Sequence, residues 1–149
     1  MEKILMVYCS MTGNTETIAG LVEEGIIKSG FEVVRKDALE VDADEIGDYG
    51  TVILGSYTWG DGEIPDEFLD FYDEIRGLDF TGKKFAVFGS GDTSYDNFCG
   101  AVNIIEKMIE ENGGQIVLES LMVEQYPDEN DEERCKEFGK RFAESVKSF

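Results

Sequence analysis

Two patterns of apolar and polar residues recur along this chain: short, nearly continuous apolar runs, and longer stretches with apolar positions three and four residues apart. Continuous runs are typical of strands buried on both faces of a sheet, and the wider spacing is typical of helices with one buried face. The runs predict strands at residues 3–8, 31–36, 51–57 and 83–90 and a fifth strand region at 115–123. The helical spacing predicts helices at residues 14–28, 66–76, 101–112 and 129–146, and a short acidic helical segment at 41–49.

The ends of these elements carry residues that end or begin helices. Ser29 and Gly30 follow the first predicted helix, and Pro65 precedes the second; glycine suits a helix end and proline a helix start. Strands that alternate with helices along the whole chain predict one α/β domain over residues 1–149, with an open parallel sheet covered by helices on both faces. In such sheets ligands bind where the carboxyl ends of the strands meet. We therefore expect function in the loops after the first, third and fourth strands.

The charge balance is strongly acidic. Thirty-three Asp and Glu residues against thirteen Lys and Arg residues give a formal net charge of −20. This charge argues against nucleic acid and anionic membrane surfaces as partners. Two interpretations stay open: the acids only keep the surface solvated, or they steer docking to proteins with basic faces.

The residues of common metal and acid–base sites are scarce. Histidine is absent, and Cys9, Cys99 and Cys135 have no metal-type spacing. We expect reduced thiols and no metal site. No apolar run approaches the ~20 residues of a membrane span, and the chain starts with a strand-like run rather than a signal peptide. We therefore expect a cytoplasmic protein without a membrane partner.

The loop after the first strand is rich in hydrogen-bonding side chains and has no cation. It consists of Ser10, Met11, Thr12, Gly13, Asn14 and Thr15 and runs into the first predicted helix. The first N–H groups of a helix lack intrahelical partners, and together with the helix dipole they can hold a phosphate. A single Ser or Thr at such a place is more often a helix cap. Four polar side chains in six residues favour the phosphate site.

The other two loops each carry an aromatic residue beyond a buried strand. Trp59, the only tryptophan, follows the third strand, and Tyr95 lies in the loop after the fourth. Each ring taken alone could pack over a helix end or lie on the surface, but together they suggest the two walls of a slot for a planar ligand. All three loops lie in stretches without Lys or Arg, at residues 4–27, 37–75 and 85–106.

At this point three motifs together resemble one family, the flavodoxins. The motifs are Ser-x-Thr-Gly-Asn-Thr after the first strand, Thr-Trp-Gly-Asp after the third and Gly-Asp-x-Ser-Tyr-x-x-Phe-Cys-Gly after the fourth. The resemblance covers essentially the whole chain, and the compact fifth strand region is similar to that of short-chain flavodoxins of sulfate-reducing bacteria. It implies a flavodoxin-like sheet of five parallel strands in the order 2-1-3-4-5 and one noncovalently bound FMN.

The resemblance also implies where FMN would bind. Residues 10–15 would wrap the phosphate, Trp59 and Tyr95 would sandwich the isoalloxazine ring, and Gly60 and Asp61 would face its N5 and O4 atoms. The pyrimidine edge would meet Asp92, Asn97 and Cys99. The other residues of the implied site are Tyr57, Thr58, Ser90, Gly91 and Phe98.

The implied function is a low-potential one-electron carrier that shuttles between semiquinone and hydroquinone among redox proteins and turns over no substrate of its own. An uncharged phosphate loop suits this task, because a cation ~10 Å from the flavin would stabilise the reduced anion by ~1.7 kcal/mol at an effective dielectric of ~20, or roughly 70 mV. We expect a monomer that docks to basic faces of redox proteins. The alternative is a dedicated FMN-binding partner of one enzyme system, such as ribonucleotide reductase maturation.

Other classes with this topology fit the residues poorly. A phosphatase would need Cys-x5-Arg after the first strand, but Cys9 is followed at that spacing by Thr15. A receiver module would need acids at the ends of the first and third strands, which are absent, and so are the glycine motifs of dinucleotide-binding folds and P-loop NTPases.

Overall fold

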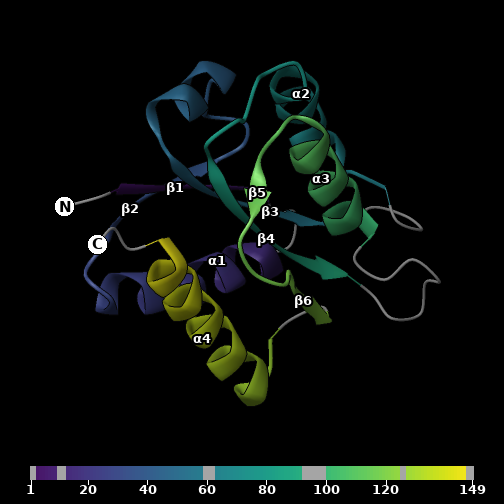
Figure 1. Cartoon of the computed structure of the whole chain (residues 1–149). Helices are drawn as coiled ribbons and strands as arrows, with labels where there is room; N and C mark the ends of the chain where they lie inside the picture. Colours follow the sequence, from purple (N-terminus) through teal and green to yellow (C-terminus); the bar gives the residue numbers. More distant parts are fainter. Residues whose placement is uncertain (1–2, 10–12, 59–62, 92–99, 125–126, 147–149) are drawn as a thin grey trace.

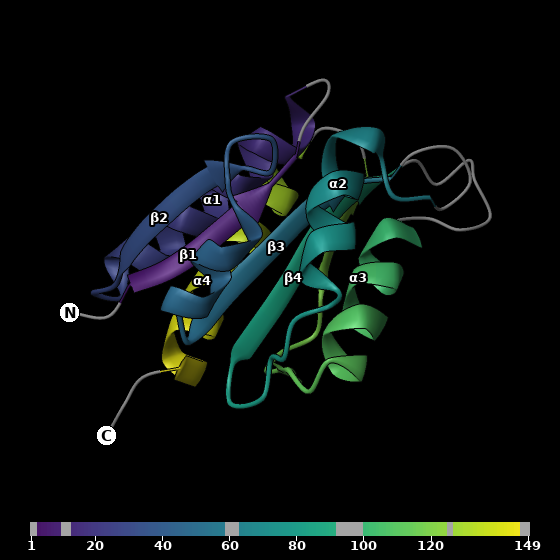
Figure 2. The same cartoon turned by 90° about the horizontal axis from the view of Figure 1, so that it is seen from above.

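A parallel sheet forms the centre of the computed structural model, which describes residues 3–9, 13–58, 63–91, 100–124 and 127–146. Its strands lie in the order β2-β1-β3-β4-β5, and a further strand, β6, also pairs with β4. The strand bounds are β1 Lys3–Tyr8, β2 Glu32–Asp37, β3 Thr51–Tyr57, β4 Lys84–Gly91, β5 Gln115–Ile116 and β6 Leu121–Glu124. Figure 2 shows β2, β1, β3 and β4 side by side in this order. The predicted α/β class and strand order are confirmed.

The fifth strand region is where the structure corrects the prediction. Residues 115–123 form two short strands, and each pairs with a different part of β4. Between the pairs Phe85–Ile116 and Phe88–Leu121 the chain advances five positions against three on β4, so two extra residues interrupt the ladder. An apolar run by itself does not reveal such an interruption, because the interruption depends on how the segment pairs with the neighbouring strand β4.

Helices cover both faces of the sheet. Their bounds are α1 Asn14–Lys28, α2 Asp66–Ile75, α3 Gly100–Glu111 and α4 Glu129–Val146, with a 3-10 helix, η1, at Ala43–Asp48 in place of the helical segment predicted at 41–49. Figure 1 shows α1 and α4 on one side of the sheet and α2 and α3 on the other. The predicted helix positions are confirmed to within a residue or two at their ends.

Strand geometry divides the core into two clusters. Successive side chains of a strand point to opposite faces, so in β1 Leu5 and Val7 pack with α2 and α3, whereas Ile4 and Met6 pack with α1 and α4. All four side chains are fully buried. This burial on both faces explains why the strand sequence is continuously apolar rather than alternating.

Two glycines allow α1 and α4 to pack closely. A Cβ atom built on Gly25 would lie 2.0 Å from the carbonyl oxygen of Lys136, and one on Gly139 would lie 2.1 Å from that of Val22. Both separations are far below van der Waals contact, so a side chain at either position would force the helices apart. The contact fixes α1 against α4.

Candidate functional site

The carboxyl ends of β1, β3 and β4 meet at one edge of the sheet because all three strands are parallel and adjacent. This is the edge at which the sequence predicts a ligand site. Of the predicted site residues, the structure describes Gly13, Asn14, Thr15, Tyr57, Thr58, Ser90 and Gly91. The others lie outside the described residues: Ser10, Met11, Thr12, Trp59, Gly60, Asp61, Asp92, Tyr95, Asn97, Phe98 and Cys99.

The first helix begins at this edge with a glycine as its N-cap. Gly13 has φ 88°, a left-handed conformation that glycine adopts without strain. Its carbonyl oxygen accepts hydrogen bonds from both the N–H and the hydroxyl of Thr17, each at 3.0 Å. Because glycine has no side chain with which to cap the helix, the helix start suits an acceptor that comes from outside the helix. This observation fits the phosphate group of FMN.

A pair of buried hydroxyl groups ties the start of α1 to the end of β4. The Oγ1 atom of Thr15 and the Oγ atom of Ser90 lie 3.0 Å apart, and the two residues are 0% and 3% exposed. A buried hydroxyl without a partner would cost free energy, so each of these groups holds the other in place. The pair therefore fixes the first turn of α1 against the end of β4, although the two residues are 75 positions apart in the chain.

The end of β3 is tied to the same strand and to α3. The N–H of Thr58 donates to the carbonyl oxygen of Ser90 at 3.0 Å, and the N–H of Ala101 donates to the Thr58 hydroxyl at 3.3 Å. Thr58 thus bonds to residues on both sides of segment 92–99. Together with the Thr15–Ser90 pair, these bonds place an end of each of the three predicted loops within one hydrogen-bonded group.

Tyr57 forms a contact that the sequence did not suggest. Its hydroxyl donates a hydrogen bond to Oε2 of Glu67, in the first turn of α2. Burial raises the pKa of the Tyr57 hydroxyl, and the hydrogen bond to Glu67 raises it further. Tyr57 is half-buried and packs against the core cluster on the side of α2 and α3. A contact of Tyr57 with a cofactor stays a prediction.

Cys9 lies at the same edge but is unsuited to be a nucleophile. Its side chain is fully buried, and burial raises the pKa of the thiol to about 12. Its sulfur lies 3.4 Å from the hydroxyl oxygen of Ser56, which donates to the carbonyl oxygen of Tyr57 at 2.7 Å. A thiol that stays protonated near neutral pH argues against the phosphatase alternative and fits a small core residue.

Arg35 brings a cation nearer to the edge than the sequence indicates. It lies on β2, whose residues pair directly with those of β1, and its guanidinium carbon lies 5.9 Å from the ring centroid of Tyr8, the last residue of β1. Its Nε atom lies 3.2 Å from Oε1 of Glu23 on α1, which offsets the positive charge. The positions of Lys and Arg along the chain do not reveal this contact, because β1 and β2 are neighbours in the sheet but are separated in sequence by α1.

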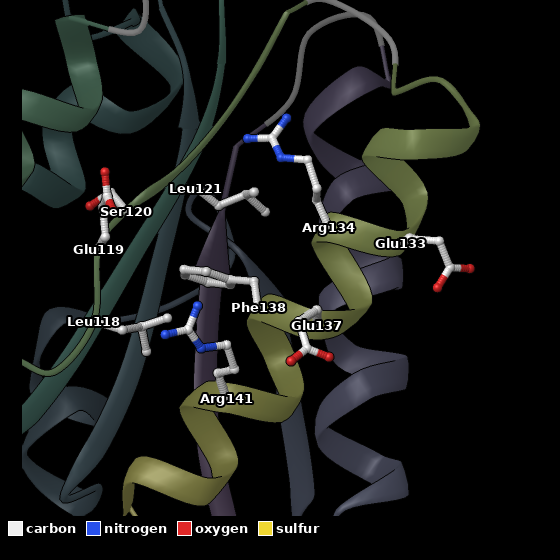
Figure 3. Close-up of a pocket in the computed structure, with 9 residues that line it drawn as sticks. All are labelled: Leu118, Glu119, Ser120, Leu121, Glu133, Arg134, Glu137, Phe138 and Arg141. Carbon is white, nitrogen blue, oxygen red and sulfur yellow. The ribbon is translucent and has the colours of Figure 1, made fainter.

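A hollow lies on the flank of α4. It has a volume of about 540 Å³, and Figure 3 shows its walls, the segment 118–121 and one side of α4. Arg134 lines it and donates to the carbonyl oxygen of Met122 at 3.1 Å and to Oδ1 of Asp131 at 2.8 Å. Of the predicted site residues that the structure describes, none lines this hollow.

The described residues form neither a metal-binding cluster nor a membrane-spanning helix. Among them, no group of three or more His, Cys, Asp or Glu side chains could hold a metal ion. Within the same ranges, no helix combines the length and the apolar character that crossing a membrane requires.

Comparison with known proteins gives a consistent set of matches. Residues 6–139 match the family model described as Flavodoxin. The chain is 51% identical over 144 residues to the probable flavodoxin 2 of Bacillus subtilis, covering 96% of this chain and 95% of the relative. It is 40% identical over 134 residues to the flavodoxin of Maridesulfovibrio salexigens, covering 88% and 92% of the two chains. The crystal structure of oxidised Flavodoxin 2 from Bacillus cereus superposes with a TM-score of 0.93 at 49% identity, over 97% of this chain and 99% of that one.

Proposed function

The chain belongs to the flavodoxin family, whose members are FMN-binding electron-transfer proteins, and from this premise we propose that it is a low-potential one-electron carrier with one noncovalently bound FMN. The single observation that supports this most directly is the sheet edge at which a glycine-capped helix start meets the bonded group Thr15, Ser90 and Thr58. An FMN molecule needs hydrogen-bond donors for its phosphate beside a surface for its ring. At this edge the helix start lies next to the strands that lead into the two aromatic loops.

The residues proposed to hold FMN come from the three loops. Those around the phosphate are Ser10, Met11, Thr12, Gly13, Asn14 and Thr15. Those along the ring and the ribityl chain are Tyr57, Thr58, Trp59, Gly60, Asp61, Ser90, Gly91, Asp92, Tyr95, Asn97, Phe98 and Cys99. When bound, the flavin supplies the one-electron chemistry, and the chain supplies neutral donors for the phosphate and aromatic walls for the ring.

The acidic surface would keep the potential of the last electron low. The chain carries a net charge of −20, and Glu16 adds a carboxylate to the first turn of α1, at the proposed phosphate site. Negative charge near the flavin opposes the addition of a further electron, and the neutral phosphate loop does nothing to offset this. The protein would therefore be a strong reductant once fully reduced.

The same charge defines the proposed partners. Redox proteins with basic faces would be drawn to the acidic surface, and the attraction would weaken as salt screens it. We propose that the protein acts as a cytoplasmic monomer and has no substrate turnover of its own. A carrier that serves several donors and acceptors should transfer electrons with more than one basic redox protein, whereas a dedicated partner of one enzyme system should not.

Titration of the apoprotein with FMN tests the proposal. Binding of one FMN per chain should quench flavin fluorescence and give a yellow protein. Replacing either proposed ring wall, Trp59→Ala or Tyr95→Ala, should weaken binding roughly two- to tenfold, because an aromatic contact contributes about 0.5–1.5 kcal/mol. The matched control is Ile27→Ala, which removes an exposed apolar side chain near the far end of α1 and should leave binding unchanged.

Two results would contradict the proposed function. The first is a folded protein that does not bind FMN at micromolar concentration. The second is a bound flavin whose two one-electron potentials, measured by spectroelectrochemistry, equal those of free FMN. Either result would show that the edge does not hold and tune the cofactor.

A further inference from the structure

The hollow on the flank of α4 holds a local concentration of positive charge in a strongly acidic chain. Arg134 and Arg141 both line it, although the chain carries a net charge of −20. We propose that this hollow is a binding site for a small aromatic carboxylate, with the carboxylate on Arg141 and the aromatic ring between the two arginines. The inference does not rest on the proposed function, because none of the described residues that line the hollow belongs to the three loops proposed to hold FMN.

The two arginines come from one stripe of α4. Positions 134, 138 and 141 are four and three residues apart, so their side chains share one face of the helix, and the two arginines are separated by ~10 Å along the helix axis. Figure 3 shows their guanidinium groups on either side of the Phe138 ring, where α4 faces segment 118–121. A ligand in the hollow therefore meets a cation at each end and an apolar surface between them.

The floor of the hollow is apolar and fixed. Phe138 and Leu121 are almost fully buried, and both belong to the core cluster on the side of α1 and α4. Leu118 packs against the same cluster and lines the hollow as well. The volume of about 540 Å³ lies within the range of roughly 300–1,000 Å³ that is typical of small-molecule sites, which combine apolar walls with a few polar groups.

The two arginines differ in the donors that they leave for a ligand. The guanidinium group of Arg134 is held in place by its hydrogen bonds to Met122 and Asp131, and the Asp131 carboxylate offsets part of its charge. Arg141 forms no ion pair with any described residue, so its charge is the less compensated of the two. A carboxylate binds a free, planar guanidinium group by bidentate hydrogen bonds. The fixed cation of Arg134 suits the face of an aromatic ring.

The charges around the hollow favour a ligand with a single negative charge. The net charge of −20 repels a polyanion at many points, whereas one carboxylate in direct contact with Arg141 gains a close attraction and meets the repulsion only once. Glu119, Glu133 and Glu137 also line the hollow, but Figure 3 shows their carboxylates outside the space between the two guanidinium groups. That space therefore accepts one anionic group on an apolar body.

Indole-3-acetate is a suitable probe, because it carries one carboxylate on a planar aromatic body. We would titrate the isotope-labelled full chain by NMR after adding one equivalent of FMN, which keeps the probe out of the proposed FMN site. Amide signals of segment 118–121 and of α4 around residues 134–141 should shift, with a dissociation constant on the order of 1 mM for a molecule of this size. Neutral indole-3-acetamide should bind roughly three- to fivefold more weakly, because it lacks the charge.

Variants separate the roles of the two arginines. Arg141→Met should weaken binding of indole-3-acetate roughly three- to fivefold and leave binding of the acetamide unchanged, because only the carboxylate contacts Arg141. Arg134→Met should weaken both molecules by about twofold, because it removes the cation that faces the ring. The matched control is Lys140→Met, which removes the same charge from an exposed position of α4 that does not line the hollow. Thermal melting shows that each variant is folded.

Three results would overturn the proposed site. The first is the absence of shifts in segment 118–121 and α4 at about 10 mM indole-3-acetate. The second is equal binding of the acetate and the acetamide. The third is a loss in Lys140→Met as large as that in Arg141→Met, which would show that net charge governs binding. A chain that binds indole-3-acetate at this hollow but does not bind FMN contradicts only the proposed function, and the reverse contradicts only this site.

Discussion

Replacing Thr15 by valine tests the hydroxyl pair that joins the helix start to β4. The substitution keeps the shape of the side chain and removes only its hydroxyl, which lies 3.0 Å from that of Ser90. Both residues are almost fully buried, at 0% and 3% exposure. Water therefore cannot easily replace the lost partner, and the Ser90 hydroxyl is left without this hydrogen bond.

The size of the effect follows from that burial. Leaving a buried hydroxyl unsatisfied costs about 1–3 kcal/mol, so we expect Thr15→Val to lower the free energy of unfolding of the apoprotein by about 2 kcal/mol. For a domain of this size, that corresponds to a fall in melting temperature of roughly 4–8 °C. Ser90→Ala should have a similar cost. In the double variant no hydroxyl is left alone, so its loss should be smaller than the sum of the two by about 1–2 kcal/mol.

Urea unfolding of the apoprotein, followed by circular dichroism, measures all three variants. The control is Thr51→Val, whose hydroxyl donates to the carbonyl oxygen of Lys3 at 3.3 Å in an exposed setting. Because water can replace this bond, the control should change stability by less than about 0.5 kcal/mol. Losses for Thr15→Val and Ser90→Ala that add to within about 0.3 kcal/mol would refute the coupling between the two hydroxyls.

Three further predictions concern packing, thiol chemistry and pH. Gly139→Ala would place a Cβ atom 2.1 Å from the carbonyl oxygen of Val22, so it should lower the unfolding free energy by about 2–3 kcal/mol; an unchanged melting curve would contradict the close packing of α1 and α4. Cys9, with a buried thiol of pKa about 12, should not react with a disulfide reagent at pH 8 until urea unfolds the chain, and rapid labelling of the native protein would contradict its burial. The pKa of Glu45 is lowered from 4.5 by its hydrogen bond to Lys36, so this carboxylate stabilises the fold above pH 4.5 and the effect is lost as pH falls through the lower folded value. The stability difference between wild type and Glu45→Gln should therefore disappear in acid, and a difference that persists at pH 2 would show another cause.

Several elements could be predicted from the sequence because their signals are local. The bounds of β1 and β3 match the predicted strands, since a strand buried on both faces needs an unbroken apolar run. The bounds of α1 and α4 also match, because an amphipathic helix repeats its apolar positions over several turns. The short segment 41–49 contains too few turns to distinguish an α-helix from the 3-10 helix that forms there.

The candidate site, like the fold, could be predicted from the sequence only in part. The sequence alone predicted the kind of site: polar residues without a cation before a helix, aromatic residues after two strands, and an acidic net charge. It indicated the strands whose ends carry these residues, because a parallel sheet brings its carboxyl ends to one edge. The matches to flavodoxins over nearly the whole chain agree with that interpretation.

Only the tertiary structure decided which residues meet. Thr15 bonds to Ser90, Tyr57 bonds to Glu67, and Arg35 approaches Tyr8 from the neighbouring strand. It also decided that residues 115–123 split into β5 and β6, because pairing with β4 sets where a strand can continue. The physical reason is shared: periodicity records how a segment faces the core, whereas a contact between distant segments depends on how the whole sheet and its helices pack.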